Sequence, residues 1–181
     1  MDHITKLFLA LALCVVVMAH QTVAINFIKG KNLINNVCNL SPTRNLCVQV
    51  LSSDESSPNA DLRDLAVIAL RVAASNASSI LTDAKMLIDD ANLNPEVQQG
   101  LSDCKENILD AEDQLEDTIA ALLEDDDTQA QKWLKAALAA ITTCDASIPG
   151  DDDVLSVKSA QFRQLCNIAI VITKALPNLK F

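Results

Sequence analysis

Two cysteines placed symmetrically about an acidic run constrain the fold of this chain more than any other feature. Cys104 and Cys144 have their midpoint at Glu124, where the run 124–127 begins. On both sides of this run mostly apolar residues recur at steps of three and four, as along one face of an α-helix. They are Val97, Leu101, Ile108, Ala111, Leu115, Thr118 and Leu122 before it and Ala130, Trp133, Leu134, Ala137 and Ile141 after it. If the two helices fold back about the acidic run, Cys104 meets Cys144 and a disulfide closes the open end.

A second pair of cysteines repeats this symmetry on a smaller scale. Cys38 and Cys47 flank the break 39–43, and their midpoint lies between Pro42 and Thr43. Two helices this short are marginal alone, so we expect a disulfide to hold them while their apolar faces dock on the main body. Sequence alone allows three pairings among these four cysteines. Symmetry favours Cys38–Cys47 and Cys104–Cys144.

Polar segments, helix-capping residues and a proline divide the rest of the chain into four long helices. The polar segment 52–59 leads into a long helix that begins at Asp61 and carries its apolar face to Ala91. Asn94 caps the second helix. Thr128 and Gln131 form a capping box for the third. The fourth opens at 151–153 and ends before Pro177, with an apolar face of Leu155, Phe162, Leu165, Cys166, Ala169, Ile172, Thr173 and Leu176.

These elements predict an all-α fold in one domain. It is an antiparallel up-down-up-down four-helix bundle with an N-terminal, disulfide-closed helical hairpin extension. The hairpin is expected within 25–57 and the bundle within 58–181.

Residues 1–24 are typical of a secretory signal peptide. An apolar stretch, 7–19, follows Lys6 and leads to the small residues that precede a cut after Ala24. This stretch is shorter than the roughly 20 residues that a membrane-spanning helix needs, and we expect no later segment to span either. The sequence therefore predicts a secreted protein, in a compartment where disulfides persist.

The expected processing removes the residues on which most catalytic sites depend. Both histidines, His3 and His20, lie in the signal segment, and the chain contains no tyrosine. Nucleophilic triads and zinc sites built on imidazole are thereby excluded. A carboxylate-only glycosidase needs a walled sugar cleft, which few aromatic residues could line. The acidic runs lack the ligand spacing of a calcium loop. We expect no enzyme, no cofactor and no metal.

The charge balance indicates what kind of partner the protein could bind. A net charge of −10 argues against nucleic acid and against anionic membranes and favours a basic protein partner. The acids could equally serve only to keep the protein soluble. Four of them repeat at steps of four, three and four, away from the apolar seam, and we call them the acidic stripe: Glu106, Asp110, Asp113 and Asp117. This stripe is either a docking surface or a solvated helix face.

Three further residues have features of their own. Cys166 is the odd cysteine, and its apolar neighbours predict a buried, inert thiol. Asn39 and Asn76 each begin an Asn-x-Ser pattern, which marks an acceptor for N-glycosylation in a secreted protein.

Several motifs together resemble those of the plant invertase and pectin methylesterase inhibitor family, over essentially the whole mature chain. They are the Cys-x8-Cys spacing at 38–47, the second cysteine pair, the run Trp133-Leu134-Lys135-Ala136-Ala137-Leu138 leading to Thr142-Thr143-Cys144, and Leu165-Cys166-Asn167-Ile168-Ala169-Ile170-Val171-Ile172. The resemblance implies a helical hairpin on a four-helix bundle, the two pairings favoured above, and a free fifth cysteine.

The resemblance also implies a function, for which two target enzymes compete. Invertase inhibitors carry a Pro-Lys-Phe motif at the turn between the second and third bundle helices, whereas residues 126–130 here read Asp-Asp-Thr-Gln-Ala. The other runs are more similar to pectin methylesterase inhibitors, which implies a 1:1 complex with that esterase in the cell wall. Thr143 matches a threonine that contacts the esterase in similar inhibitors. The alternatives are an acid invertase inhibitor and a non-inhibitory structural or storage bundle of pollen or seed.

Overall fold

The computed structural model of the chain describes residues 29–150 and 155–176, which form six helices and no strand. The signal peptide expected at 1–24, the opening of the last helix at 151–153 and its stop at Pro177 lie outside these residues. Two short helices are followed by four long ones: α2 (Gly30–Cys38), α3 (Arg44–Ser52), α4 (Leu62–Ile88), α5 (Pro95–Leu123), α6 (Asp127–Ser147) and α7 (Ser156–Ala175).

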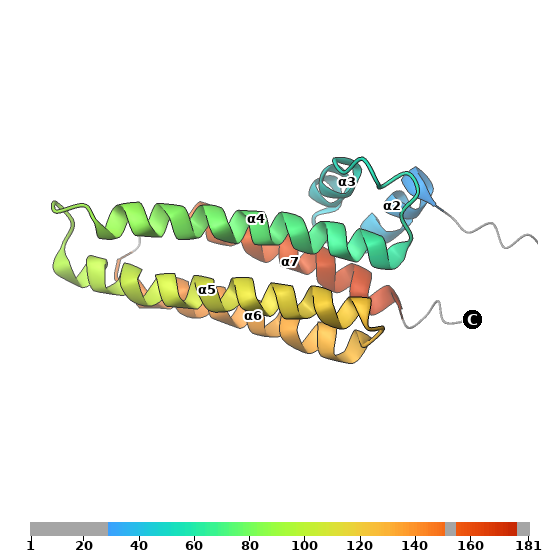
Figure 1. Cartoon of the computed structure of the whole chain (residues 1–181). Helices are drawn as coiled ribbons and strands as arrows, with labels where there is room; N and C mark the ends of the chain where they lie inside the picture. Colours follow the sequence, from blue (N-terminus) through green and yellow to red (C-terminus); the bar gives the residue numbers. More distant parts are fainter. Residues whose placement is uncertain (1–28, 151–154, 177–181) are drawn as a thin grey trace, which may run out of the picture.

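The four long helices lie side by side, and the short pair packs on one side of them (Figure 1). Each long helix contacts the next along the chain, and α7 closes the bundle by packing against α4. Helices α2 and α3 form a hairpin in which α3 contacts α4 and α2 contacts α7. The predicted all-α bundle with a hairpin extension is confirmed.

The predicted core faces are buried with few exceptions. On α5, Leu101, Cys104, Ile108, Ala111, Leu115, Thr118 and Leu122 are 2% exposed or less. Only Val97 of the predicted seam is partly buried, because it lies in the first turn, where the bundle ends. Helix α4 stops at Ile88, so Ala91 is exposed outside it, contrary to the predicted face. The Asp90 carboxylate accepts from the backbone N–H of Asn92 at 2.9 Å, a local turn that competes with helical bonding.

Helix starts follow their capping residues, with one correction. Asn94 accepts from the backbone N–H of Glu96 at 2.8 Å, as expected of an N-cap. The capping box predicted at Thr128 is wrong, because α6 already begins at Asp127 and Asp126 caps it by accepting from Gln129 N at 3.0 Å. The chain turns this early because Asp125 adopts a left-handed conformation, φ 59°, which asparagine and aspartate tolerate.

An arginine in the first turn of α4 secures this α5–α6 turn. Arg63 Nη1 lies 2.7 Å from the carbonyl oxygen of Leu122 and 2.9 Å from Asp127 Oδ1. Its Nη2 lies 3.0 Å from Asp125 Oδ1. The Asp127 side chain is 8% exposed, so its charge needs this partner. Sequence pattern did not indicate this contact, which joins residues about sixty positions apart.

Helix α4 also corrects an expectation about membranes. By length and composition it could cross one, since its most apolar window has a mean hydropathy of 1.5. The statement that no later segment qualifies was therefore wrong. However, 56% of that window is buried inside the protein, as in the core helix of a soluble bundle. The apolar residues of α4 pack against α5 and α7.

Two disulfides join the cysteine pairs that symmetry favours. Cys38 is bonded to Cys47 within the hairpin, with their Cα atoms 5.5 Å apart, and Cys104 to Cys144 between α5 and α6. All four cysteines are 1% exposed or less. The second bridge therefore ties two core helices at the end remote from their turn.

We predict that the Cys104–Cys144 bridge contributes more to stability than the Cys38–Cys47 bridge. In the loop-entropy description, bridges spanning 40 and 9 positions stabilise by about 4 and about 2.6 kcal/mol. Replacing each pair with alanine and comparing melting temperatures under identical conditions measures the difference. A larger loss from the hairpin pair would contradict the prediction.

Candidate functional site

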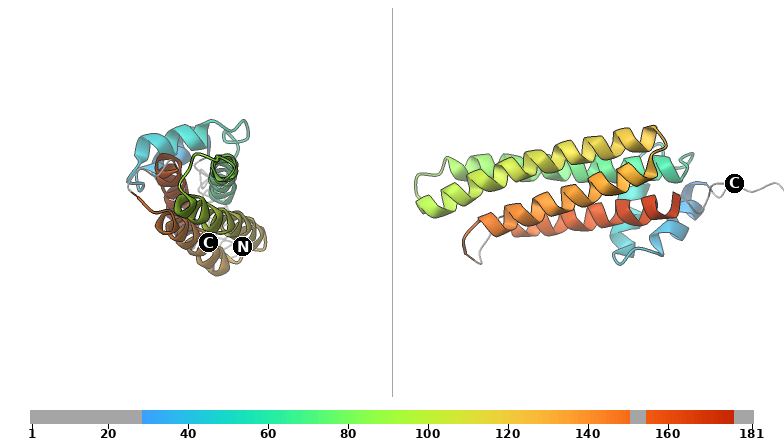
Figure 2. Two further views of the ribbon diagram at one scale, coloured as in Figure 1. Left: turned by 90° about the vertical axis from the view of Figure 1, so that its left-hand side faces the viewer. Right: turned by 90° about the horizontal axis from the view of Figure 1, so that it is seen from below.

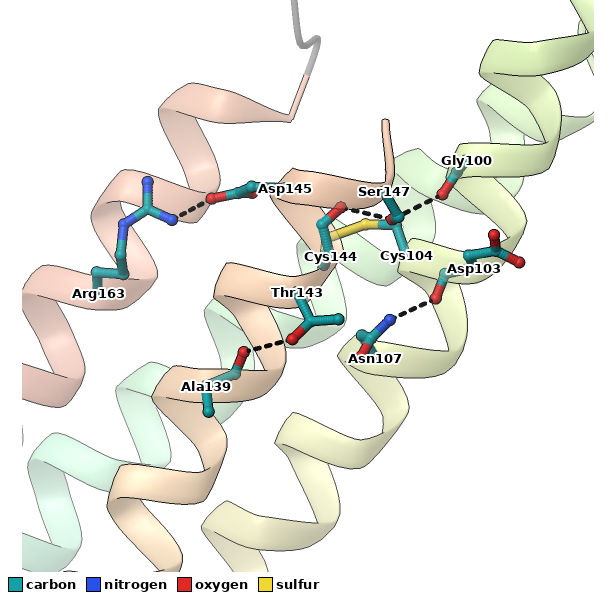
Figure 3. Close-up of a disulfide and its surroundings, with 10 residues drawn as sticks. All are labelled: Gly100, Asp103, Cys104, Asn107, Ala139, Thr143, Cys144, Asp145, Ser147 and Arg163. Atoms are coloured by element: carbon teal, nitrogen blue, oxygen red, sulfur yellow. Dashed lines mark hydrogen bonds and ion pairs between the residues drawn. A yellow bond between two sulfur atoms is a disulfide. The ribbon is translucent and has the colours of Figure 1, made fainter. Parts of the chain in front are cut away.

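The candidate site lies on α5 and α6, close to the bridge between them (Figure 3). Ser147 Oγ lies 2.7 Å from the Cys144 carbonyl oxygen and 3.1 Å from that of Gly100, so the hydroxyl links α6 to α5. On the other side of α6, Arg163 of α7 forms an ion pair with Asp145. This end of the bundle is therefore held from both neighbouring helices.

Gly100 permits the close approach of α5 to the end of α6. A Cβ atom at this position would lie 2.3 Å from the Ser147 carbonyl oxygen and 2.9 Å from Ile148 Cα and Pro149 Cδ. The Ser147 oxygen and Ile148 Cα are backbone atoms, and they cannot move aside without shifting the end of α6. The glycine is therefore required by packing and not by its backbone conformation.

Thr143 is exposed on α6 next to the bridge, facing the turn of α5 that carries Asp103 and Asn107 (Figure 3). Its Oγ1 donates to the Ala139 carbonyl oxygen at 3.0 Å. Because a hydroxyl has one proton, the lone pairs of Oγ1 remain to accept a hydrogen bond. A partner that uses Thr143 must therefore supply a donor.

The acidic stripe begins near the level of Thr143 and runs along α5 towards the α5–α6 turn. All four of its residues are exposed. Glu106 lies 3.0 Å from Lys105 Nζ, an ion pair in which the glutamate stays 67% exposed. Within the described residues no ion pair involves Asp110, Asp113 or Asp117. Three of the four carboxylates are thus available to an external cationic group.

The remaining predicted residues occupy contrasting environments. Cys166 is free, fully buried on α7, and burial raises the pKa of its thiol to about 12. Asn39 is exposed in the hairpin turn. Asn76 lies in the interior of α4, half-buried, and its Oδ1 is buried without a hydrogen-bond partner. The exposed Asn39 is better placed than Asn76 to carry a glycan, which remains a prediction for both.

Sequence reasoning missed several residues that shape this surface. Gly100 gave no pattern, and only its place in an otherwise glycine-poor helix could have drawn attention to it. Lys132 lies over the Trp133 ring, 5.3 Å from its centroid.

Within 29–150 and 155–176 no group of three or more His, Cys, Asp or Glu side chains is arranged to hold a metal ion.

The fold and site together define a class of protein: a disulfide-bonded helical bundle that presents a rigid, charged outer surface. Comparison with protein families makes this specific. Residues 32–172 match the model of the plant invertase/pectin methylesterase inhibitor family, and the chain belongs to that family. Its members are inhibitors and not enzymes, so a protein partner is implied and no catalytic group is needed.

Relatives and a solved structure support the assignment. The chain is 28% identical over 157 residues to a pectinesterase inhibitor of Actinidia deliciosa, a match covering 84% of each chain. It is 29% identical over 145 residues to a putative invertase inhibitor of Platanus acerifolia, covering 77% of this chain and 80% of the relative. The crystal structure of a mutant pectin methylesterase inhibitor from Arabidopsis has the same fold, with a TM-score of 0.67 at 23% identity. The match covers 78% of this chain and 95% of the other.

We predict that Gly100→Ala destabilises the protein by about 1–3 kcal/mol, the usual cost of overpacking. Alanine is the better helix former by about 1 kcal/mol, so propensity alone would give the opposite sign. Thermal and denaturant unfolding measure the change. The control is Gln99→Ala, an exposed position in the same turn that should change stability far less. Equal or greater stability of Gly100→Ala would refute the close contact.

We predict that the Cys166 thiol does not react with a thiol reagent at neutral pH until the protein unfolds. It is both buried and un-ionised, since its pKa of about 12 is raised from an ordinary value of 9.0. Because the folded state raises the pKa of this thiol, the free energy of unfolding should not change with its ionisation below pH 9. It should decrease as the pH rises from 9 towards 12. Labelling rates with and without denaturant, followed by mass spectrometry, test this. Rapid labelling of the folded protein would show that α7 exposes the thiol.

Proposed function

We propose that this protein is a secreted inhibitor of pectin methylesterase that covers the enzyme's pectin cleft in a 1:1 complex. The observation that carries the proposal is the exposed acidic stripe on α5, which begins near Thr143 of α6 and of which Asp110, Asp113 and Asp117 have no ion-pair partner among the described residues. A cleft that holds an anionic polymer is expected to be bordered by basic groups, which such a row complements. The relatives named pectinesterase inhibitors, from Actinidia deliciosa and Arabidopsis thaliana, support the choice of target.

Inhibition of this kind depends on rigidity and not on chemistry. The bridge at one end of the α5–α6 pair and Arg63 at the other limit how the two helices can move. A preorganised surface loses little conformational entropy on binding. Thr143 adds an acceptor at a fixed position, since its hydroxyl proton is directed to Ala139.

Inhibition of acid invertase is the second candidate, because relatives from Platanus are named putative invertase inhibitors at similar identity. The α5–α6 turn argues against it. Its residues are acidic, and residues 126–130 lack the Pro-Lys-Phe motif of invertase inhibitors in this family. Arg63 also holds Asp125 and Asp127 close to α4. A turn held in this way is poorly suited to enter an active site.

Secretion to the cell wall is part of the proposal. The predicted signal peptide supports it, as do two disulfides, which persist in oxidising compartments. Titrating the purified mature protein against a plant pectin methylesterase and an acid invertase in parallel tests the target. Inhibition of the esterase alone supports the proposal. Inhibition of neither favours a structural or storage protein.

We predict that charge on the acidic stripe accelerates association with the esterase. Converting all four residues to amides keeps their size, and the association rate at low salt should fall roughly tenfold. The difference should shrink with added salt, because exposed charges are screened over about 10 Å at 0.1 M. Stopped-flow or surface-based kinetics at two salt concentrations measure it.

A matched control removes four exposed carboxylates elsewhere, again as amides: Glu55, Asp89, Glu96 and Glu124. This variant has the same net charge and should associate nearly as fast as the unmodified protein. Both variants should first be shown to have the helicity of the original. Equal association rates for both variants would mean that only net charge matters. In that case the contact surface would have to be sought around Thr143.

A further inference from the structure

The helical hairpin has a charge opposite to that of the rest of the molecule. Residues 29–53 contain three bases, Lys29, Lys31 and Arg44, and no acid. Residues 95–127, which cover α5 and the turn after it, contain 12 acids and one base. The net charge of −10 therefore conceals a positively charged hairpin; α7 also carries three bases and no acid, but its Lys158 and Arg163 pair with carboxylates of the bundle.

The three bases of the hairpin are available to a partner. All are exposed, and within the described part of the chain none forms an ion pair. By contrast, Arg63 and Lys158 are only partly exposed and pair with carboxylates of the bundle. The first acids beyond the hairpin are Asp54 and Glu55, and Asp54 is turned towards Ser56, whose N–H and hydroxyl it accepts.

Arg44 is held in an orientation that suits a carboxylate. Its Nε donates to Asn39 Oδ1 at 2.7 Å. Among the described residues its terminal nitrogens have no hydrogen-bond or ion-pair partner, so they remain free. A guanidinium presents its N–H groups as a planar fork that matches a carboxylate in two parallel hydrogen bonds.

The tip of the hairpin that carries Arg44 is rigid. The Cys38–Cys47 bridge closes it. The backbone N–H groups of Leu40 and Ser41 donate to carbonyl oxygens one turn back, each at 3.1 Å. The N–H of Thr43 donates to Ser41 Oγ at 3.2 Å. Binding at this tip would cost little ordering of the protein.

The exposed surface around the bases is rich in amides. It includes Asn32, Asn36, Asn39, Asn45 and Gln49. Amide side chains both donate and accept, as the hydroxyl groups of a sugar do. Leu40 at the tip is 65% exposed and offers an apolar surface to the C–H face of a sugar ring. Cations, amides and an apolar side chain thus occur together on one small element.

The hairpin lies on the side of α4 and α7, away from α5 and α6 (Figures 1 and 2). The acidic stripe is on the outer face of α5, so a polymer at the hairpin would be separated from it by the bundle. Exposed charges farther apart than about 10 Å are largely screened at 0.1 M salt. The charge of the acidic stripe therefore has little effect on a ligand at the hairpin.

We propose that the hairpin is a binding surface for an acidic polysaccharide that carries carboxylates on its sugars, a polyuronate. Other polyanions fit less well. Three bases are fewer than the cluster of 4–8 expected for an anionic membrane. The hairpin, residues 29–53, contains no aromatic side chain on which nucleic acid bases could stack.

One consequence rests on the proposed function, although the binding itself does not. The pectin that the esterase demethylates acquires such carboxylates. An inhibitor attached to this polymer through its hairpin would be concentrated where the enzyme acts, with α5 and α6 still free to bind it.

The test measures binding of bacterially produced, oxidised protein, which carries no glycan, to polygalacturonate by affinity electrophoresis at low and high salt. The probe for comparison is fully methyl-esterified pectin, which has the same sugars without charge. We expect retardation by polygalacturonate at low salt, a decrease with added salt, and little retardation by the ester. The triple variant K29Q/K31Q/R44Q should bind about tenfold more weakly.

A second triple variant, K85Q/K132Q/K135Q, changes the net charge equally at exposed positions outside the hairpin. It should bind as the original does. Equal losses in both variants, no binding by the original, or equal binding to the ester would overturn the proposal. So would tighter binding to phosphatidylserine vesicles or single-stranded DNA, or self-association that the hairpin variant abolishes. Because no esterase is present, failure here leaves the proposed inhibitory function standing.

Discussion

The antiparallel pairing of α5 and α6, fixed at both ends, is the constraint on which the rest of the structure depends. At one end the Cys104–Cys144 bridge sets which turn of α5 lies opposite which turn of α6. At the other, Arg63 holds Asp125, Asp127 and the end of α5. Between these points the register of α5 against α6 is fixed, and the seam residues are buried. Helices α4 and α7 complete the bundle by packing against this pair.

This arrangement explains how an acidic protein keeps a buried apolar core. Helix α5 carries its buried apolar residues on one face, so its carboxylates project outwards, where water solvates them. Asp127 is the one strongly buried carboxylate among the residues that the structure describes. It lies in the first turn of α6 beside Arg63, where both the helix dipole and the guanidinium stabilise its charge. The outer surface can therefore vary in charge without disturbing the packing beneath it.

How much the sequence could predict follows the range of each interaction. The bundle, the seam on α5 and the cysteine pairing rest on periodicity and symmetry, which are local or self-consistent, and they were predicted. The start of α6 was misplaced because threonine and aspartate are both common N-caps, and the left-handed Asp125 places the start at the aspartate. Arg63 and Gly100 could not be found, since their partners are distant in sequence. The exposure of Glu106 and Asp110 could be predicted from periodicity, whereas the lack of an ion-pair partner for Asp110 within the described part of the chain could not.

Two surfaces of opposite sign, separated by an apolar bundle, give this protein more binding capacity than its net charge suggests. On α5 and α6 the surface offers acceptors: free carboxylates and a Thr143 hydroxyl whose proton is already committed. A partner there must donate and carry positive charge. On the hairpin the surface offers donors, from Arg44 and its neighbouring amides, and a partner must accept. Because the two requirements are opposite, the two proposed surfaces suit different ligands, and the bundle between them keeps the two sites apart.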